Sequence, residues 1–139
     1  MEAIVLKHTG GTENFEHTQL PTPVIQEEEV LVNVKAISIN PADVATRYMQ
    51  AFQDYILKLK PGQPIVLGWD ISGVVEEVGT AVSTFKKGDA VFGMVHFPGH
   101  GDAYAEYVAA PASHLALKPD TIRFEDAAAA TMAALTAWQ

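Results

Sequence analysis

The sequence predicts a mainly β protein with a few helices (α+β), built as a barrel or a tightly curved sheet. The main observation is the run from Pro64 to Val95, which is rich in strand-forming residues and carries glycines at Gly68, Gly73 and Gly79. Glycines inside strands mark sharp bends and places where another backbone comes close. Helical patterns, by contrast, are short and lie outside this run. A chain of 139 residues is long enough to form one domain with its own core.

The composition argues against several classes of function. Nine Lys and Arg residues stand against 17 Asp and Glu residues, which gives a formal net charge of −8. An acidic surface repels phosphate backbones and anionic membranes, so we expect no nucleic-acid or membrane partner. The absence of cysteine excludes disulfides, a thiolate nucleophile and Cys-ligated zinc sites. The apolar run Ala3 to Leu6 is too short for a signal peptide or a membrane span, which predicts a cytoplasmic protein.

Three extended segments are predicted in the first 40 residues. Met1 to Lys7 and Phe15 to Leu20 are strand-like runs separated by the turn Gly10-Gly11. From Val30 to Ala36 apolar and polar residues alternate, as in a half-buried strand. The apolar phase switches to Ile37 and Ile39, which predicts a β-bulge or burial on both faces just before Asn40.

A short helical region is predicted next. Asn40 is a suitable N-cap and Pro41 a suitable first helical residue, so Ala42 to about Gln50 is expected to be a helix. A second helical piece, Ala51 to Leu59, is expected to end at the proline and glycine residues that follow.

The remainder of the chain contains two strands and two helices. The segment from His96 to Asp102 is expected to be an irregular loop, followed by strands over Tyr104 to Ala109 and His114 to Leu117. An alanine-rich helix is predicted from Glu125, and a second helix from Met132 to Gln139. The chain stops inside that last pattern without a cap, so we expect it to be part of a longer protein.

Local spacing raises two other kinds of site, a metal site and a hydrolase site. His96 and His100 are four residues apart with Asp102 nearby, a spacing that suggests a metal site. The intervening Pro98-Gly99 prevents the helical face that would align the two imidazoles, so we interpret them as surface loop histidines. Ser72 has no plausible His-Asp partners in the local sequence, which gives hydrolase chemistry little support.

Five segments together identify a family resemblance. They are Asn40-Pro41-Ala42-Asp43, Leu67-Gly68-Trp69-Asp70-Ile71-Ser72-Gly73-Val74-Val75, Phe85-Lys86-Lys87-Gly88-Asp89-Ala90-Val91, Ala103-Tyr104-Ala105-Glu106-Tyr107-Val108 and Ala134-Leu135-Thr136-Ala137-Trp138. In this order and spacing they resemble the N-terminal, GroES-like domain of medium-chain dehydrogenases/reductases. The resemblance implies a GroES-like, partly open β-barrel over residues 1–123 that serves as the substrate and catalytic domain. Residues 124–139 would then be the first helical segment leading to a missing Rossmann domain.

Within that superfamily the chain is most similar to the zinc-free quinone oxidoreductases (ζ-crystallin-like) and related enone reductases. Zinc-dependent members carry a cysteine ligand where this chain has Asn40, and Gly-His-Glu where it has Gly68-Trp69-Asp70. A carboxamide and an indole do not provide the donors that zinc prefers. We therefore expect no metal.

The resemblance also implies a reaction and a set of site residues. The reaction is hydride transfer from NADPH, or alternatively NADH, to a small quinone or α,β-unsaturated carbonyl substrate, in a longer protein that forms a homo-oligomer. Asn40 is expected to be catalytic and to lie near the nicotinamide. Thr136 is expected to contact the cofactor, and Arg47, Tyr48 and Trp69 to surround the substrate.

Structural alternatives remain open for the same residues. Asn40 is equally suited to a simple N-cap, Asp43 is expected to anchor backbone, and Trp69 is equally suited to core packing. The alternative function is a non-catalytic GroES-like barrel that acts as an interaction or structural module, with a co-chaperonin as a more remote possibility. The chain has no dinucleotide-binding glycine fingerprint, so we expect the missing domain to supply most of the cofactor site and this fragment alone to be inactive.

Overall fold

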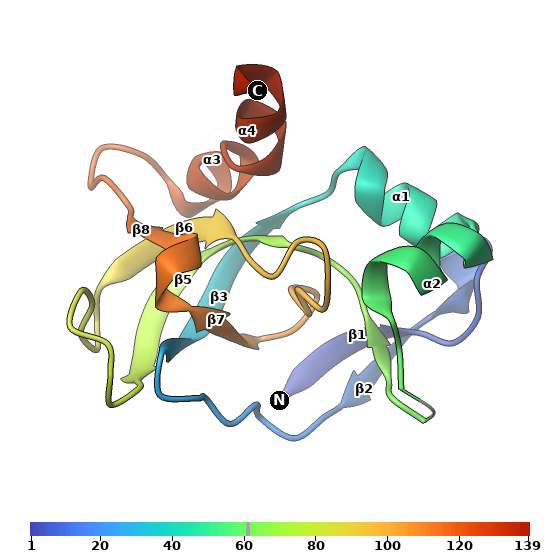
Figure 1. Ribbon diagram of the computed structural model, residues 1–139, viewed down its shortest axis with the longest axis horizontal. Coiled ribbons are helices and arrows are strands. Elements are labelled where there is room, and N and C mark those ends of the chain that lie inside the picture. The colour runs from blue at the N-terminus through green and yellow to red at the C-terminus, as the bar shows by residue number, and fades with distance from the viewer. Residues whose placement is uncertain (61) are drawn as a thin grey trace.

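The computed structural model of the chain describes residues 1–139 except Pro61 (Figure 1). The strands are β1 (Glu2–Leu6), β2 (Phe15–Gln19), β3 (Glu29–Ser38), β4 (Ile65–Val66), β5 (Asp70–Val78), β6 (Ala90–Met94), β7 (Tyr107–Pro111) and β8 (Leu115–Leu117). The α-helices are α1 (Pro41–Tyr48), α2 (Gln50–Leu57), α3 (Phe124–Ala129) and α4 (Met132–Trp138). Single turns of 3-10 helix occupy Thr12–Asn14 and Ala112–His114. The predicted mainly β fold with a few helices is confirmed.

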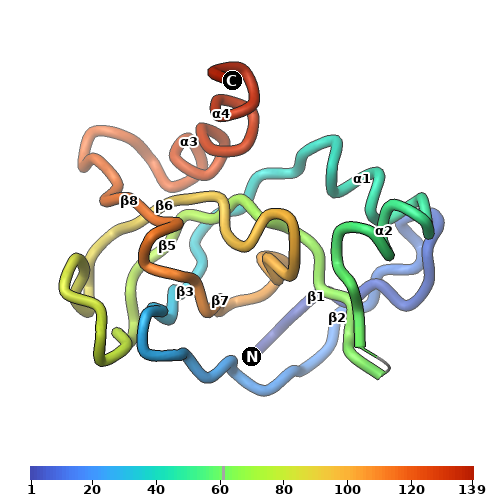
Figure 2. The backbone as a smooth tube through the Cα atoms, viewed as in Figure 1, coloured from blue at the N-terminus to red at the C-terminus, as the bar shows by residue number. Residues whose placement is uncertain are grey.

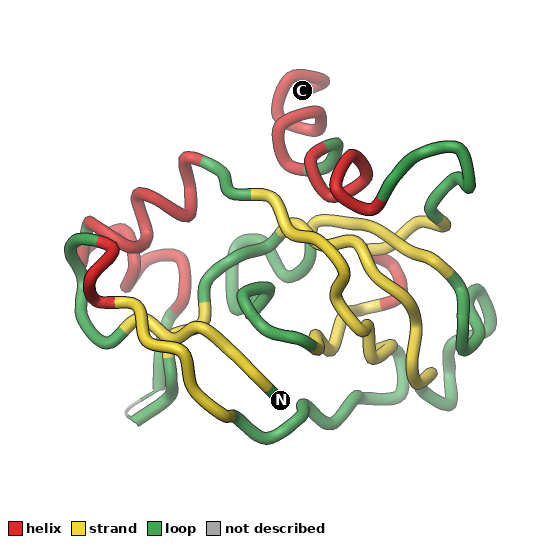
Figure 3. Tube along the Cα trace, turned by 180° about the vertical axis from the view of Figure 1, so that it is seen from behind, coloured by secondary structure: helices red, strands yellow, loops and turns green. Residues whose placement is uncertain are grey.

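The strands form two open antiparallel sheets. The smaller sheet has the order β2-β1-β4 and the larger has the order β7-β3-β5-β6-β8. The two sheets meet where the segment before β7 passes β1: the backbone N–H of Ile4 donates to the carbonyl of Tyr104 over 2.8 Å, and Ala3 and Ala105 form an isolated bridge. Among the described residues, hydrogen-bonded pairing does not close the sheets into a full barrel, which confirms the partly open form. The helices lie around the sheets as two separate pairs, α1 with α2 and α3 with α4 (Figure 1 and Figure 3).

The long central pair β3 and β5 determines where polar side chains meet. Its register shifts between Val34 and Ala36, so the bulge expected near the end of this strand is present, slightly earlier than predicted. Beyond the bulge, Ser38 pairs with Asp70 at the start of β5. Asn40 follows Ser38 by two residues, so it leaves the sheet beside Asp70.

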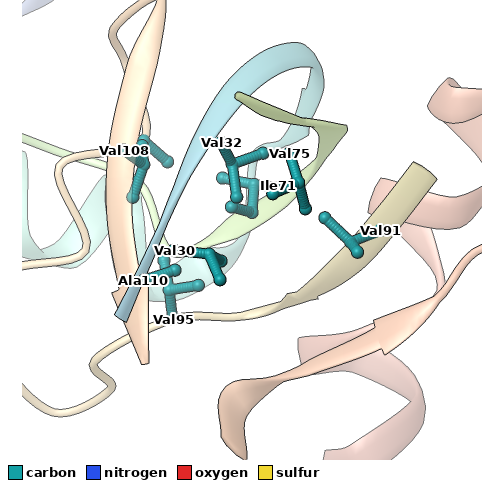
Figure 4. Packing of buried hydrophobic residues seen from close by; sticks show 9 residues of the cluster. Val30, Val32, Ile71, Val75, Val91, Val95, Val108 and Ala110 are labelled. Carbon is teal, nitrogen blue, oxygen red and sulfur yellow. The ribbon is translucent and has the colours of Figure 1, made fainter. Parts of the chain in front are cut away.

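The main core fills the space enclosed by the larger sheet (Figure 4). Its fully buried aliphatic side chains come from alternate positions of facing strands, as strand periodicity requires. They include Val30, Val32, Ile71, Val75, Val91, Val95, Val108 and Ala110. Removing these side chains from water provides the main driving force for folding.

A second core joins the helices to the smaller sheet. Its buried members are Leu6, Ile56, Leu57, Leu67, Trp69 and Met132. Met132 is the first residue of α4, so the start of this helix belongs to the packed body of the protein. In addition, α3 packs on β3, β5 and β6, and the hydroxyl of Ser72 donates to the carbonyl of Phe124 at the start of α3.

Several element boundaries differ from the prediction; among them, α2 ends at Leu57 instead of Leu59. The helix predicted from Ala42 to Gln50 ends at Tyr48, and α2 begins at Gln50 after the extended residue Met49. Strand β7 begins at Tyr107 instead of Tyr104, because the preceding residues bond to β1 and, through the Glu106 carbonyl, to Val34 of β3. The N-terminus lies at the start of β1, and the C-terminus lies at the end of α4, away from the sheets (Figure 2). In the described part of the chain, no helix combines the length and the hydrophobicity needed to cross a membrane.

Candidate functional site

The start of α1 is held by a reciprocal capping arrangement. Asn40 is the N-cap, Pro41 is the first helical residue, and Asn40 and Asp43 form a capping box. The Asp43 carboxylate accepts a hydrogen bond of 2.8 Å from the backbone N–H of Asn40. This pairing satisfies a donor that the helix itself leaves without a partner. The N-cap position of Asn40 and the anchoring role of Asp43 are thus confirmed.

The side chain of Asn40 is bound to a second carboxylate. Its amide nitrogen donates to Oδ2 of Asp70 over 2.9 Å. Asn40 is 6% exposed and Asp70 is fully buried. Both oxygens of Asp70 also lie 3.3 Å from the backbone N–H of Met132, at the start of α4. One buried carboxylate therefore contacts both the cap of α1 and the first residue of α4.

Thr136 is connected to the same group through Met132. The hydroxyl of Thr136 donates to the carbonyl of Met132 over 2.8 Å, while the N–H of Met132 contacts Asp70. The structure thereby links the two residues for which cofactor contact was predicted, Asn40 and Thr136, by a continuous set of hydrogen bonds. Thr136 itself is exposed.

An open apolar hollow of about 570 Å³ lies against Asn40 and one face of α1. Its lining residues are Ile39, Asn40, Pro41, Val44, Ala45, Tyr48 and Met49. The guanidinium carbon of Arg47 lies 5.6 Å from the ring centre of Tyr48, within the range of a cation–π contact. Asn40 and Tyr48 are thus brought together at the hollow, with Arg47 beside the tyrosine.

Trp69 lies elsewhere, in the second core. Its side chain is fully buried, and its indole N–H donates to the carbonyl of Gly99 over 2.9 Å. Phe97 packs edge-on against the ring at a centroid distance of 5.3 Å. Trp69 consequently presents no exposed surface to a substrate in this structure, and the core-packing alternative is the role that the structure shows.

Asp43 sits in an environment that disfavours its charge. The residue is 2% exposed, and its Oδ1 atom has no hydrogen-bond partner among the described residues. Burial raises the pKa of Asp43, and the nearby carboxylate of Asp70 raises it further. Burial also raises the pKa of the adjacent Tyr104 hydroxyl, with the charge of Asp43 as the next cause. The hydrogen bond from the backbone N–H of Asn40 opposes part of the shift in the pKa of Asp43.

This environment predicts how stability depends on pH. Because the pKa of folded Asp43 lies above its ordinary value of 3.8, the stability that Asp43 contributes is present below that pH and falls as pH rises through the folded pKa. Asp43→Asn mimics the protonated form, so we expect this variant to gain stability relative to the wild type as the pH increases, with the gain levelling off once Asp43 has ionised. Urea unfolding of both proteins at a series of pH values measures the difference.

The free energy of unfolding is plotted against pH for the wild type and for Asp43→Asn. Subtracting one plot from the other removes the contributions of the titrating groups that the two proteins share. The opposite result would contradict this prediction. If the wild type becomes more stable relative to Asp43→Asn as the pH rises, the fold stabilises the ionised form of Asp43.

A larger hollow of about 700 Å³ lies at the loop between β6 and β7, away from Asn40. His96 and His100 both line it but take separate partners. The backbone N–H of His96 donates to Nδ1 of His114, and His100 lies 3.3 Å from the amide of Gln63. Both histidines lie in this loop and are half-buried, with 32% of the His96 side chain and 26% of the His100 side chain exposed. No group of three or more His, Asp or Glu side chains suited to a metal ion is found within residues 1–60 and 62–139.

The contact between Asp70 and Met132 was not anticipated from the sequence. In the sequence, Asp70 stands where zinc-dependent relatives have a glutamate, and this position alone predicts no role for it. One feature of the sequence does indicate a role for Asp70. A charged residue at the start of an apolar strand is either exposed to solvent or, when buried, paired with hydrogen-bond donors. Its partners were not predictable, since they lie 30 and 62 residues away along the chain.

The chain is similar in sequence and in structure to known oxidoreductases. Residues 26–120 match the family described as the alcohol dehydrogenase GroES-like domain. An NADPH-dependent alkenal/one oxidoreductase from Arabidopsis thaliana is 35% identical, over 99% of this chain and 36% of its own length. The structure of a quinone oxidoreductase from Coxiella burnetii is 37% identical with a TM-score of 0.92, covering 100% of this chain and 43% of that one.

A third relative was crystallised with a cofactor. The quinone oxidoreductase of Escherichia coli in complex with NADPH is 28% identical with a TM-score of 0.81, covering 99% of this chain and 39% of that one. This chain therefore spans about two fifths of the length of the proteins that it matches.

Proposed function

The chain belongs to the alcohol dehydrogenase GroES-like domain family, and from that premise we propose that it is the substrate-binding, catalytic N-terminal part of a zinc-independent NAD(P)H-dependent oxidoreductase. The proposed substrates are quinones or α,β-unsaturated carbonyls, the classes named for the relatives from Coxiella burnetii and Arabidopsis thaliana. NADPH is the favoured cofactor, because it is named for two of the three relatives. Residues 1–123 form the barrel in this proposal, and residues 124–139 the connection to a cofactor domain.

The observation that carries the proposal is the apolar hollow lined in part by Asn40, together with the contacts through Asp70 and Met132 that link Asn40 to Thr136. A nicotinamide ring needs flat apolar walls and a few polar contacts, and this hollow offers apolar side chains with a single amide at its edge. When bound, NADPH supplies the hydride. Asn40 would orient the ring, and the exposed hydroxyl of Thr136 retains lone pairs for a second contact because its proton is donated to Met132.

The substrate would enter beside Tyr48 and Arg47. The Tyr48 side chain is 64% exposed at the rim of the hollow, where its hydroxyl is available to donate a hydrogen bond to a carbonyl oxygen. The Arg47 guanidinium next to it places positive charge near the negative charge that develops on that oxygen. The apolar residues of α1 would exclude water from the reacting atoms.

The side chains at the zinc position of related enzymes are unsuited to a metal. The amide nitrogen of Asn40 points its hydrogen at Asp70, and the indole nitrogen of Trp69 points its hydrogen at Gly99. Neither nitrogen has a lone pair to offer, and Asp70 already accepts from two donors. These contacts support a reaction without zinc.

The proposal is tested by expressing the full-length protein and measuring NADPH oxidation with a panel of quinones and enals. We expect turnover, and we expect Asn40→Ala to lower kcat/KM about tenfold, which corresponds to one lost contact of about 1.4 kcal/mol. Asn33→Ala is the matched control, because this half-buried asparagine bonds to Tyr107 on another part of the sheet.

Unchanged kinetics in Asn40→Ala would remove that residue from the site. Absence of NADPH oxidation with every acceptor would favour the alternative, a non-catalytic interaction module. The isolated chain is expected to bind NADPH weakly and not to turn over, because most of each relative lies outside the matched region. A homo-oligomeric state and a cytoplasmic location of the full-length protein also remain predictions.

A further inference from the structure

Asp70 is a buried carboxylate for which the proposed reaction has no direct use. It is the first residue of β5, it is fully buried, and it pairs with Ser38 of β3 and Met94 of β6. A buried carboxylate is costly unless donors surround it. The hydrogen-bond donors around Asp70 offset the cost of burying its carboxylate. They therefore identify the elements of the fold that Asp70 connects.

Its two protein donors come from different elements. The amide nitrogen of Asn40 lies 2.9 Å from Oδ2, and the backbone N–H of Met132 lies 3.3 Å from both oxygens. Both partners are donors, so Asp70 acts as an acceptor toward each, which is what an ionised carboxylate provides.

The contact with Asn40 determines which way its amide faces. If the amide were turned by 180°, its oxygen would replace the nitrogen beside Oδ2 of Asp70, and two acceptors would face one another. Reversal would therefore replace a charge-assisted hydrogen bond with a repulsion. Asp70 holds the amide of Asn40 in one orientation at the edge of the hollow.

The contact with Met132 positions α4 in a similar way. The N–H of Met132 is one of the helix-start donors that α4 cannot satisfy internally. Its bond to Asp70 fixes the first turn of α4 on the barrel, and the side chain of Met132 is packed in the second core. Thr136 lies one turn further along, with its hydroxyl bonded to the carbonyl of Met132.

We propose that Asp70 is a positioning residue that orients the Asn40 amide and holds α4, with Thr136, at a fixed separation from it. This inference rests on the proposed function, in which both residues contact NADPH. Asp70 would act through them and touch neither cofactor nor substrate.

The first experiment observes the orientation directly and does not depend on activity. In the 139-residue chain, we expect the two side-chain amide protons of Asn40 to give separate, exchange-protected NMR signals. Asp70→Ala should abolish this protection. Asp120→Asn, a substitution at an exposed aspartate, should leave it unchanged. Unprotected Asn40 amide protons in the wild type would overturn the inference.

The second experiment separates positioning from simple stabilisation in the full-length enzyme. Asp70→Asn is expected to raise KM for NADPH about tenfold with little change in KM for the quinone. The exchanged pair Asn40→Asp with Asp70→Asn restores one donor and one acceptor, so the melting temperature should recover relative to Asp70→Asn. KM for NADPH should stay raised, because a carboxylate now replaces the oriented amide.

The outcomes distinguish this inference from the proposed function. Recovery of KM together with the melting temperature would show that Asp70 is structural only, as would an unchanged KM in Asp70→Asn. If the wild-type full-length protein does not oxidise NADPH, the proposed function fails, whereas the NMR experiment still decides whether Asp70 orients Asn40. Asp70→Leu, which keeps the side-chain volume but removes both acceptor oxygens, replaces Asp70→Ala in that experiment if the alanine variant does not fold: loss of protection is expected, and retained protection contradicts the inference.

Discussion

Replacing Trp69 by alanine is expected to lower the free energy of unfolding by about 3–5 kcal/mol, the usual cost of truncating a large buried aromatic side chain. The side chain is fully buried in the second core, and Phe97 packs against its ring. Its loss also leaves the carbonyl of Gly99 without the indole donor. Because small domains have a total stability of about 5–15 kcal/mol, this variant should be close to unfolding. Urea denaturation followed by circular dichroism measures the change.

Trp138 provides a matched control for this substitution. Its side chain is 90% exposed on α4, so Trp138→Ala should change the free energy of unfolding by no more than about 0.5 kcal/mol. Equal losses in the two variants would show that Trp69 is not the core residue described above. A stable Trp69→Ala that selectively loses quinone binding would instead restore the prediction that Trp69 forms part of the substrate wall.

Replacing Gly73 by alanine is expected to cost roughly 1–3 kcal/mol through overpacking. Gly73 lies in the middle of β5, opposite Val34 at the bulge of β3. A methyl group there would overlap the backbone carbonyl of Asn33 and approach a Val32 methyl group to 2.8 Å. Because a carbonyl inside a paired sheet cannot move aside, the pairing of β3 with β5 must give way. Thermal unfolding monitored by calorimetry measures the loss.

Gly11→Ala serves as the control for backbone crowding. Gly11 has an extended backbone with φ of −76°, which any residue adopts, and a methyl group there would meet only the carboxylate end of the Glu13 side chain. That exposed side chain is free to move away, so the change should stay within about 0.5 kcal/mol. If Gly73→Ala proves equally mild, the close approach of β3 and β5 is not a packing constraint.

Local sequence signals predicted most of the secondary structure and one half of the candidate site. The N-cap Asn40, the first-turn Pro41 and the anchoring Asp43 were predictable because a capping arrangement involves residues within four positions of one another. The alternation from Val30 to Ala36 likewise predicted β3, and the change of apolar phase at Ile37 predicted a bulge near its end. Tyr48 follows Asn40 by two helical turns, so its position at the same hollow also derives from local geometry.

The sequence alone did not determine whether Trp69 forms part of a substrate cleft or part of the core. Its neighbours in sequence are compatible with either a cleft wall or a core, because a single aromatic side chain beside a glycine carries no information about which side of it other residues cover. The packing of α2 and of the segment around Phe97 over that face decided the matter. In the same way, the half-buried environment of His96 depends on His114, which follows 18 residues later.

The sequence by itself determined a mainly β, acidic, cysteine-free domain with a capped helix at Asn40 and glycines where strands approach closely. Only the tertiary structure showed that Asp70 joins Asn40 to Met132, and through it to Thr136. The physical reason is that capping and strand alternation depend on short-range backbone geometry, whereas a buried carboxylate is satisfied by whichever donors the folded chain brings to it. Those donors come from the β3–β5 register and from the packing of α4, neither of which is set by residues adjacent to Asp70.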